Sequence, residues 1–458
     1  MLQVIQCGVR FMEVADFVTG ISCAFLLVGI ALLALRMTGN NQSSMQLQVT
    51  LFLTSFFIRF AFSIVLYGTS LQTKIVGDGD DSGWMVGLYH KENWDAQQVG
   101  PLGLLPLLMG AFDGHHQGYG YLLGVLFYFT RMPSQLSAAS LDCVCGGLIA
   151  VFAYRLARVH FSEEAATRVG WWVCCFPTMI IWSAQTIKEP VVILLEVVAM
   201  YCCLRVRDKG FSLRHTVLIA VTIMSLVTMR FYAAYIVGMS VIATLALPRL
   251  GRQGLSIVSA AGVVAIVLPV LFGTKASEEH SSTYDQYSTV EGIQSFRRDI
   301  ATGTGSGVVS EYDMSTRTGL GLATLVGAAH LLLAPFPWQL NGSFRMLMTA
   351  PEMIFWWWLF FFGVIPGTRY VIRHHLGNML PILLFLLGIG TVYSLTFGNV
   401  GVIYRQRAQL MPYLLTFAAI GLERKKLRNW VVSTPSPEVG QASLRRAELK
   451  DRVRPLIS

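Results

Sequence analysis

Long apolar stretches recur along the whole chain and constrain its fold more than any other feature of the sequence. A bilayer core of about 30 Å is crossed by a helix of about 20 apolar residues. By that measure the sequence predicts about eleven transmembrane spans, near residues 14–35, 47–70, 135–156, 166–183, 188–205, 213–229, 232–248, 255–273, 347–365, 378–396 and 408–422. Only 13% of the 458 residues are charged, too few to cover a soluble core of that size. We therefore expect an all-α polytopic membrane protein.

The short basic connections between these spans predict how the chain lies in the membrane. Cytoplasmic loops carry an excess of Lys and Arg. The basic segments of this chain would all share one side: Arg36, 155–168, 205–209, 249–252, 369–375 and 424–428. The N-terminus lacks the basic start and small-residue cleavage site of a signal peptide, so we expect the first helix to be retained. The prediction is an outer N-terminus and a cytoplasmic C-terminus.

Two long segments then fall on the outer side, and both are acidic. Residues 73–117 hold six acids and two bases, and residues 274–318 hold seven acids and four bases. The apolar stretches 119–131 and 319–340 are too short or too rich in proline at their ends to span, so we expect interfacial or re-entrant helices on the outer face.

These features divide the chain into five expected parts. They are an extra N-terminal transmembrane helix (1–45), a core with its first external loop at 73–117 (46–272), an external loop with an interfacial helix (273–346), C-terminal transmembrane helices (347–422) and a basic cytoplasmic tail (423–458). The tail has nine basic and four acidic residues, which accounts for more than half of the formal net charge of +9. We therefore expect no nucleic-acid partner. The eight cysteines lie mostly in apolar runs and lack zinc spacing, so we expect neither disulfides nor a cysteine metal site.

An aspartate cluster follows the second predicted span directly, in the stretch IVGDGDDSGWMVGLY. Asp78, Asp80 and Asp81 lie within four positions, and Trp84 follows them. A carboxylate at the membrane edge, partly desolvated and beside like charges, is a suitable general base for removing a proton from a hydroxyl. The alternative is a solvated loop without a special role. We take the three aspartates as candidate catalytic residues and Trp84 as a candidate substrate contact.

A second polar group, DGHHQG, lies in the same external segment. Asp113, His115 and His116 could join the aspartates around a divalent ion, or they could bind a sugar. Carboxylate and imidazole ligands suit Mg²⁺, Mn²⁺ or Zn²⁺. Asp78, Asp113 and His116 are the candidate metal ligands, and His115 and His116 are also candidate substrate contacts.

The stretch FPTMIIWSAQTIKEP places Lys188 and Glu189 between two apolar runs on the outer side. The two side chains could simply pair with each other in the headgroup region. Alternatively, Lys188 could reach a lipid phosphate at the level of the aspartates. Both residues are candidate substrate contacts.

Arginines on the predicted outer side run against the usual bias of membrane proteins. MRFY places Arg230 and Tyr232 between two spans, and YRQRAQ places Arg405 and Arg407 just before the last span. Helix-end snorkelling is one explanation. Because the guanidinium fork matches a phosphate, anion binding is the other, and with Lys188 on the same face we favour it.

In this order, the motifs resemble the GT-C superfamily of membrane glycosyltransferases, in particular the bacterial branch related to protein O-mannosyltransferases and the aminoarabinose transferase. Asp80-Asp81-Ser82-Gly83-Trp84 is similar to that branch's Asp-Glu-x-x-Tyr, with Asp80 at the catalytic-base position. Further similar stretches are HHQGYGYLLGVLFYFTRMP, the two helices that close on FPTMIIWSAQTIKEP, and GNVGVIYRQRAQLMPYLLTFAAIGLE. The resemblance covers residues 47–250 well and 330–425 loosely, and the helix at 14–35 is an addition to the family's pattern.

The resemblance implies a GT-C-like core in a bacterial inner membrane, with a periplasmic site. It implies transfer of a sugar from a polyprenyl-phosphate donor to a glycan, lipid or protein acceptor, in polysaccharide or cell-envelope biosynthesis. Two alternatives stay open: a polysaccharide polymerase or O-antigen ligase, and a lipid or sugar transporter. A transporter requires charges at the bilayer midplane, where we note Arg59 and Glu196 and expect that they could pair.

Overall fold

The fold is described from a computed structural model of the chain. It describes residues 14–38, 42–69, 71, 83–112, 117–247, 261–265, 289–302, 306–308, 312–340 and 344–433, without the side chains of 42–43, 344–348 and 425–433. Helices make up nearly all of this part of the chain, which holds no β-strand beyond one isolated bridge between Gly307 and Asn399. The expected all-α class is confirmed.

The helices fall into a long and a short set. The long ones are α1 (Val14–Thr38), α2 (Gln42–Gly68), α7 (Gln135–Ala157), α10 (Glu189–Lys209), α11 (Leu213–Met229), α12 (Phe231–Ala246), α16 (Arg317–Leu333), α17 (Phe344–Leu359), α19 (Leu376–Leu395) and α20 (Val400–Ser433). The short ones are α4 (Gly83–Ala96), α5 (Leu104–Leu108), α6 (Gly118–Thr130), α8 (Glu163–Cys175), α9 (Pro177–Ser183), α15 (Val290–Ala301) and α18 (Ile365–His374). A π-helical turn, η5 (Phe360–Val364), joins α17 to α18.

Five helical segments among the described residues are long and apolar enough to cross a bilayer. They are Val14–Thr38, Ser44–Gly68, Gln135–Ala157, Thr349–His374 and Leu376–Leu395. Shorter apolar helices, including α11, α12 and α16, accompany them. The chain is therefore an all-helical, multi-pass membrane protein. Of the predicted span 255–273, only residues 261–265 lie in the described part, and they are helical.

Two predicted spans differ from the observed helices. The span expected at 166–183 is broken at Phe176, after which Pro177 starts α9. Proline has no N–H to donate and is favoured in the first turn of a helix, so the chain restarts there. The span expected at 408–422 begins earlier, at Val400, so Arg405 and Arg407 lie inside α20 rather than before it. The sequence prediction starts this span after the two charges, but both side chains have buried partners.

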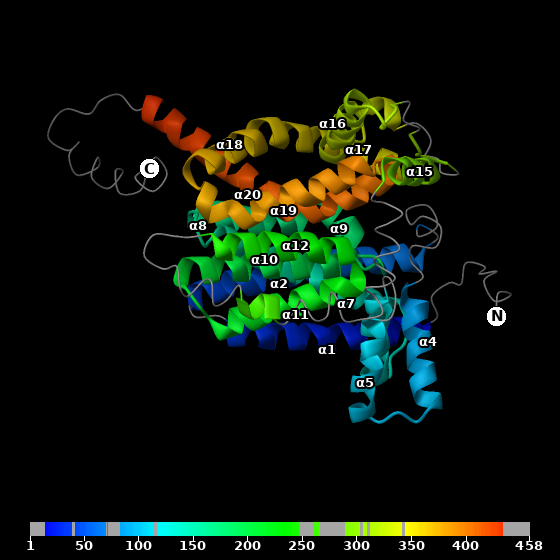
Figure 1. The fold of residues 1–458 in the computed structure, drawn as a ribbon. Helices are drawn as coiled ribbons and strands as arrows, with labels where there is room; N and C mark the ends of the chain where they lie inside the picture. Colours follow the sequence, from blue (N-terminus) through cyan, green and yellow to red (C-terminus); the bar gives the residue numbers. More distant parts are fainter. Residues whose placement is uncertain are drawn as a thin grey trace.

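Most long helices run side by side, whereas α4 and α6 stand across them at one end of the bundle (Figure 1). α1 begins at this end, and α20 leaves the bundle at the opposite end. α6 coincides with the apolar stretch 119–131, and α16 overlaps the stretch 319–340, the two stretches expected to form interfacial or re-entrant helices. α4 and α6 approach closely through glycine: a Cβ added to Gly124 would lie 2.9 Å from His90 Cβ.

Arg59, in the middle of α2, stabilises the break between α8 and α9. Its guanidinium donates to the carbonyls of Cys174 (2.8 Å) and Val173 (3.0 Å) and to Ser183 Oγ (2.6 Å). The last carbonyls of a helix lack partners within it, and a buried arginine supplies them here. The expectation that Arg59 pairs with Glu196 was wrong, because these carbonyls and hydroxyls use its donors.

Candidate functional site

A five-residue link between α9 and α10, residues 184–188, forms one side of the candidate site. α2 holds this link: Ser63 Oγ donates to the Ala184 carbonyl (2.6 Å), and the Thr186 N–H donates to Tyr67 Oη (2.9 Å). α10 then starts at Glu189. Two side chains of α2 thus hold the backbone that leads to Lys188 and Glu189.

Glu189 lies between two arginines from distant parts of the chain. Its Oε1 is 2.9 Å from Arg230 Nη2 and 3.3 Å from Arg405 Nε. Arg230 caps α11, and Arg405 lies in the second turn of α20. The side chains of Glu189 and Arg230 are 3% and 6% exposed, whereas that of Arg405 is 20% exposed. We call these three residues the Glu189 cluster; Arg405 is the member that an external ligand can reach.

A chain of hydrogen bonds leads from the Glu189 cluster into the bundle. Arg230 Nη1 donates to Tyr393 Oη (3.2 Å), which in turn donates to the Gln409 side-chain carbonyl. Gln409 Nε2 donates to Glu196 Oε1 (3.0 Å). This polar chain connects the end of the bundle to a fully buried carboxylate two helical turns along α10.

Tyr232 contributes to the edge of the same cluster. Its hydroxyl lies 3.4 Å from Tyr393 Oη, and its ring centroid is 5.8 Å from the guanidinium carbon of Arg230. Lys188, at the start of α10, is half-buried next to Glu189. Among the described side chains of this region, two arginines and one lysine surround one carboxylate, a set that suits an anionic ligand.

Arg407 does not join the Glu189 cluster. Its Nη2 lies 3.7 Å from Glu352 Oε1, its Nη1 donates to the Ala334 carbonyl (2.7 Å), and its guanidinium lies over the Tyr404 ring. Tyr404 Oη donates to Glu352 Oε2 (3.0 Å), and Thr178 Oγ1 donates to Oε1. We call Arg407, Glu352, Tyr404 and Thr178 the Glu352 cluster. The side chains of Arg407 and Glu352 are 0% and 1% exposed.

Helix geometry explains why the two arginines separate. Each residue of an α-helix turns the chain by about 100°. Side chains two positions apart, such as Arg405 and Arg407, therefore point to nearly opposite faces. The prediction that both arginines face one ligand was wrong, because it took YRQRAQ as a loop and the segment is part of α20.

Trp84 lies at the start of α4, close to the link at 184–188. It is half-buried and packs against the main core. A Cβ added to the preceding Gly83 would lie 2.7 Å from the Tyr119 ring and 3.4 Å from the Thr186 carbonyl. The residue that directly follows Asp80-Asp81-Ser82 in the sequence thus contacts the segment that leads to Lys188 and Glu189.

The remaining sequence-predicted site residues lie outside the described residues, and their roles stay predictions: Asp78, Asp80, Asp81, Asp113, His115 and His116. In the part of the chain that the structure describes, no three His, Cys, Asp or Glu side chains gather as metal ligands.

Two buried carboxylates escaped the sequence analysis. Asp142 in α7 accepts a hydrogen bond from Tyr119 Oη (2.5 Å), and Glu352 accepts those described above. Each lies inside a predicted span, and an acid within a span is itself a signal of a buried polar site.

No protein-family model matches this chain, and no curated protein matches it. Among solved structures, it is similar to the archaeal oligosaccharyltransferase AglB from Archaeoglobus fulgidus in complex with an inhibitory peptide and a dolichol-phosphate. The two are 14% identical with a TM-score of 0.47, and the match covers 89% of this chain and 54% of that one. This chain thus spans about half the length of AglB. At this level the likeness assigns neither a family nor an activity.

Proposed function

We propose that this protein is a membrane glycosyltransferase of GT-C type that transfers a sugar from a polyprenyl-phosphate donor to a hydroxyl of a glycan, lipid or protein acceptor. The observation that carries the proposal is the Glu189 cluster: Glu189 at the start of α10, Arg230 between α11 and α12, and Arg405 in α20 meet at the end of the bundle where α4 and α6 lie. A phosphate leaving group needs such a set of fixed cations.

Arg405 is the proposed phosphate contact, because it is the most exposed arginine of the cluster. Its fork can donate two hydrogen bonds to phosphate oxygens. Glu189 holds it in place and is itself held by Arg230, and Lys188 adds charge at the rim. These roles support a binding site for the negative charge that develops as the donor is cleaved.

Asp80 is the proposed general base. It takes the proton of the acceptor hydroxyl, the oxygen attacks the anomeric carbon, and the bond from that carbon to the phosphate oxygen breaks. Polyprenyl phosphate leaves with the electron pair, and the anomeric centre is inverted. Asp78, Asp81, Asp113, His115 and His116 are proposed to orient the acceptor or to hold a divalent cation. Gly83, three residues after Asp80, lies next to Thr186 in the link that leads to Glu189.

The test compares Asp80→Asn with Glu92→Gln, an exposed acid of the same external segment. Purified variants in nanodiscs are supplied with a panel of polyprenyl-phosphate sugars, and glycosidic product is measured. We expect Asp80→Asn to lower transfer about 10²- to 10⁴-fold, the range for a lost general base, with Glu92→Gln near wild type. Equal activity of the two variants would remove Asp80 from the mechanism.

The same assay separates a polymerase or ligase from this proposal. Those enzymes would depend on the arginines without needing the aspartates. Loss of transfer in both Asp80→Ala and Arg405→Ala supports the proposal. Loss in Arg405→Ala alone supports the polymerase or ligase.

A second candidate function, transport of a lipid or sugar, draws on one specific observation. Glu196 and Gln409 form a hydrogen-bonded pair inside helices α10 and α20, where a transported anion or proton could interact. Movement of labelled lipid across liposomes without any glycosidic product would favour this candidate.

A further inference from the structure

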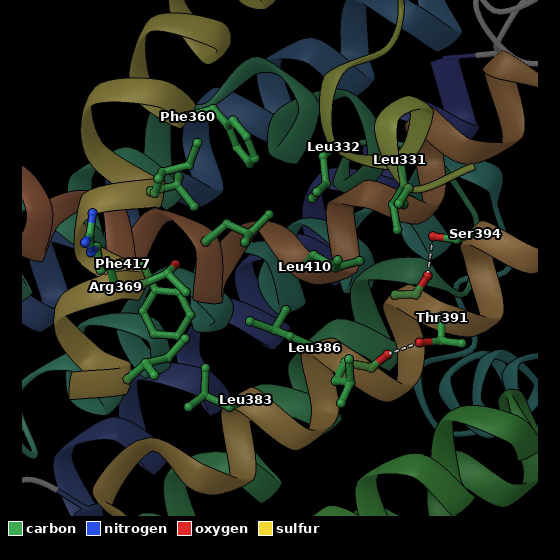
Figure 2. A pocket seen from close by; sticks show the side chains of 18 of the residues that line it. Leu331, Leu332, Phe360, Arg369, Leu383, Leu386, Thr391, Ser394, Leu410 and Phe417 are labelled. Atoms are coloured by element: carbon green, nitrogen blue, oxygen red, sulfur yellow. Dashed lines mark hydrogen bonds between the residues drawn. The ribbon is translucent and has the colours of Figure 1, made fainter. Parts of the chain in front are cut away.

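A cavity of about 800 Å³ lies between α16, α18, α19 and α20 (Figure 2). Its wall is largely leucine and other apolar side chains, among them Leu331, Leu386 and Leu410. Three lining residues are largely exposed: Leu387 (69%), Ile372 (49%) and Ile365 (46%). α18 and α19 belong to candidate membrane spans, so two walls of the cavity are helices that are apolar enough to lie in a bilayer.

The two ends of this cavity differ in charge. Arg369 lies at one end, near Leu383 and Phe417, whereas Thr391 and Ser394 lie at the other (Figure 2). The two hydroxyls donate to carbonyls of their own helix, Leu387 (2.7 Å) and Gly390 (2.6 Å), and so offer no donor to a ligand. Among the lining residues, the charged ones are Arg369 and Arg373, both exposed.

The length of the cavity matches one lipid chain in one leaflet. On the α19 wall, Leu383 and Ser394 are eleven positions apart, or about 17 Å at 1.5 Å per residue. That is close to half of a hydrocarbon core of about 30 Å. An apolar slot of this depth with cations at one end fits an amphiphile with an anionic head and a hydrocarbon tail.

We propose that this cavity binds one anionic phospholipid, whose phosphate contacts Arg369 and Arg373 and one of whose two acyl chains lies along α19 toward Ser394. The same chemistry could come from the polyprenyl-phosphate donor, but the position argues against it. Tyr393, which contacts Arg230, lies ten residues along α19 from Leu383, or about 15 Å. A phosphate at Arg369 would thus be held at the end of the cavity remote from the Glu189 cluster.

The first test fills the cavity and counts bound lipid by native mass spectrometry of the delipidated full chain in detergent. A Cβ added to Gly390 meets nothing within 4 Å, so Gly390→Phe can project its ring into the cavity. Gly29→Phe is the matched control, because Gly29 is exposed on α1 and equally open. We expect Gly390→Phe to lose phosphatidylglycerol binding and Gly29→Phe to retain it. Equal binding by the two variants would overturn the site.

The second test removes the charges. We expect wild type to bind phosphatidylglycerol in preference to phosphatidylcholine, and the double variant Arg369→Gln/Arg373→Gln to lose about tenfold of that preference. Arg36→Gln/Arg214→Gln, two exposed arginines elsewhere, should keep it. Equal binding of the two phospholipids by wild type would overturn the proposal. So would undecaprenyl phosphate that binds more tightly than phosphatidylglycerol and is lost in the same variants. Because no step measures transfer, the result is independent of the proposed activity.

Discussion

The Glu189 cluster and the Glu352 cluster use the same kinds of side chain in opposite ways. Each pairs a buried carboxylate with an arginine from the first turns of α20. The Glu189 cluster joins helix ends, and Arg405 keeps 20% of its side chain exposed. The Glu352 cluster joins α9, α17 and α20 and is closed, with Arg407 fully buried.

This difference assigns the two clusters different tasks. A sealed ion pair with hydrogen bonds on both oxygens cannot receive a ligand, so the Glu352 cluster cross-links helices. In the Glu189 cluster, Arg405 is partly exposed and can contact a phosphate while Glu189 holds its Nε. The distinction predicts that variants of the Glu352 cluster lower stability without changing catalysis. Variants of the Glu189 cluster should lower catalysis without changing stability.

The largest effect is expected from Arg407→Met. It leaves the Glu352 carboxylate buried without its cation, and removing one partner of a buried pair costs about 3–5 kcal/mol. We expect a loss of that size in the free energy of unfolding, measured by titration with sodium dodecyl sulfate in mixed micelles. Adding Glu352→Leu should restore only part of it, since Thr178 and Tyr404 then lack their acceptor. An unchanged unfolding curve for the single variant would show that the pair is not structural.

The Glu352 cluster also shows which contacts could not be predicted from the sequence. Helix class follows from apolar length alone, and α1, α2, α7 and α19 lie close to their predicted spans. The start of α20 does not, because a charged side chain can be buried when a partner from a distant helix meets it. The partner of Arg407 is Glu352, 55 residues earlier in the chain. Nothing local in YRQRAQ indicates that contact.

The position of the Glu189 cluster could be predicted in part from the sequence. Lys188, Glu189, Arg230 and Arg405 each flank an apolar run on the same predicted side, so sidedness alone brings them to one end. Which arginine pairs with Glu189 depends on the rotation of α20, which the sequence does not specify. Tyr393 and Gln409, which link the cluster to Glu196, gave no signal because neither is charged.

The second-largest effect is expected from Arg405→Gln in the Glu189 cluster. Loss of one donor to a developing oxyanion costs about 10²- to 10³-fold in kcat. We expect transfer to fall by that factor, with unfolding changed far less than in Arg407→Met, because Glu189 keeps Arg230. Arg405→Lys should recover only part of the rate, since an ammonium cannot bind two phosphate oxygens as a fork. A large stability loss without a change in rate per folded molecule would assign Arg405 to packing instead.

The smallest effects are expected from a matched pair of tyrosine variants, one in each cluster. Tyr404→Phe removes the donor to Glu352 Oε2, and a hydrogen bond to a charged group contributes about 1.5–3 kcal/mol. Tyr232→Phe removes a weaker contact with Tyr393, worth about 0.5–1.5 kcal/mol. We expect Tyr404→Phe to lower stability while the rate per folded molecule stays near wild type. Tyr232→Phe should barely change unfolding but reduce transfer by up to about tenfold, because it loosens Arg230 beside the phosphate site. Unfolding titrations and transfer rates measured on the same preparations test both. If the two variants changed stability and rate in the same proportion, the division into a closed structural cluster and an open binding cluster would be wrong.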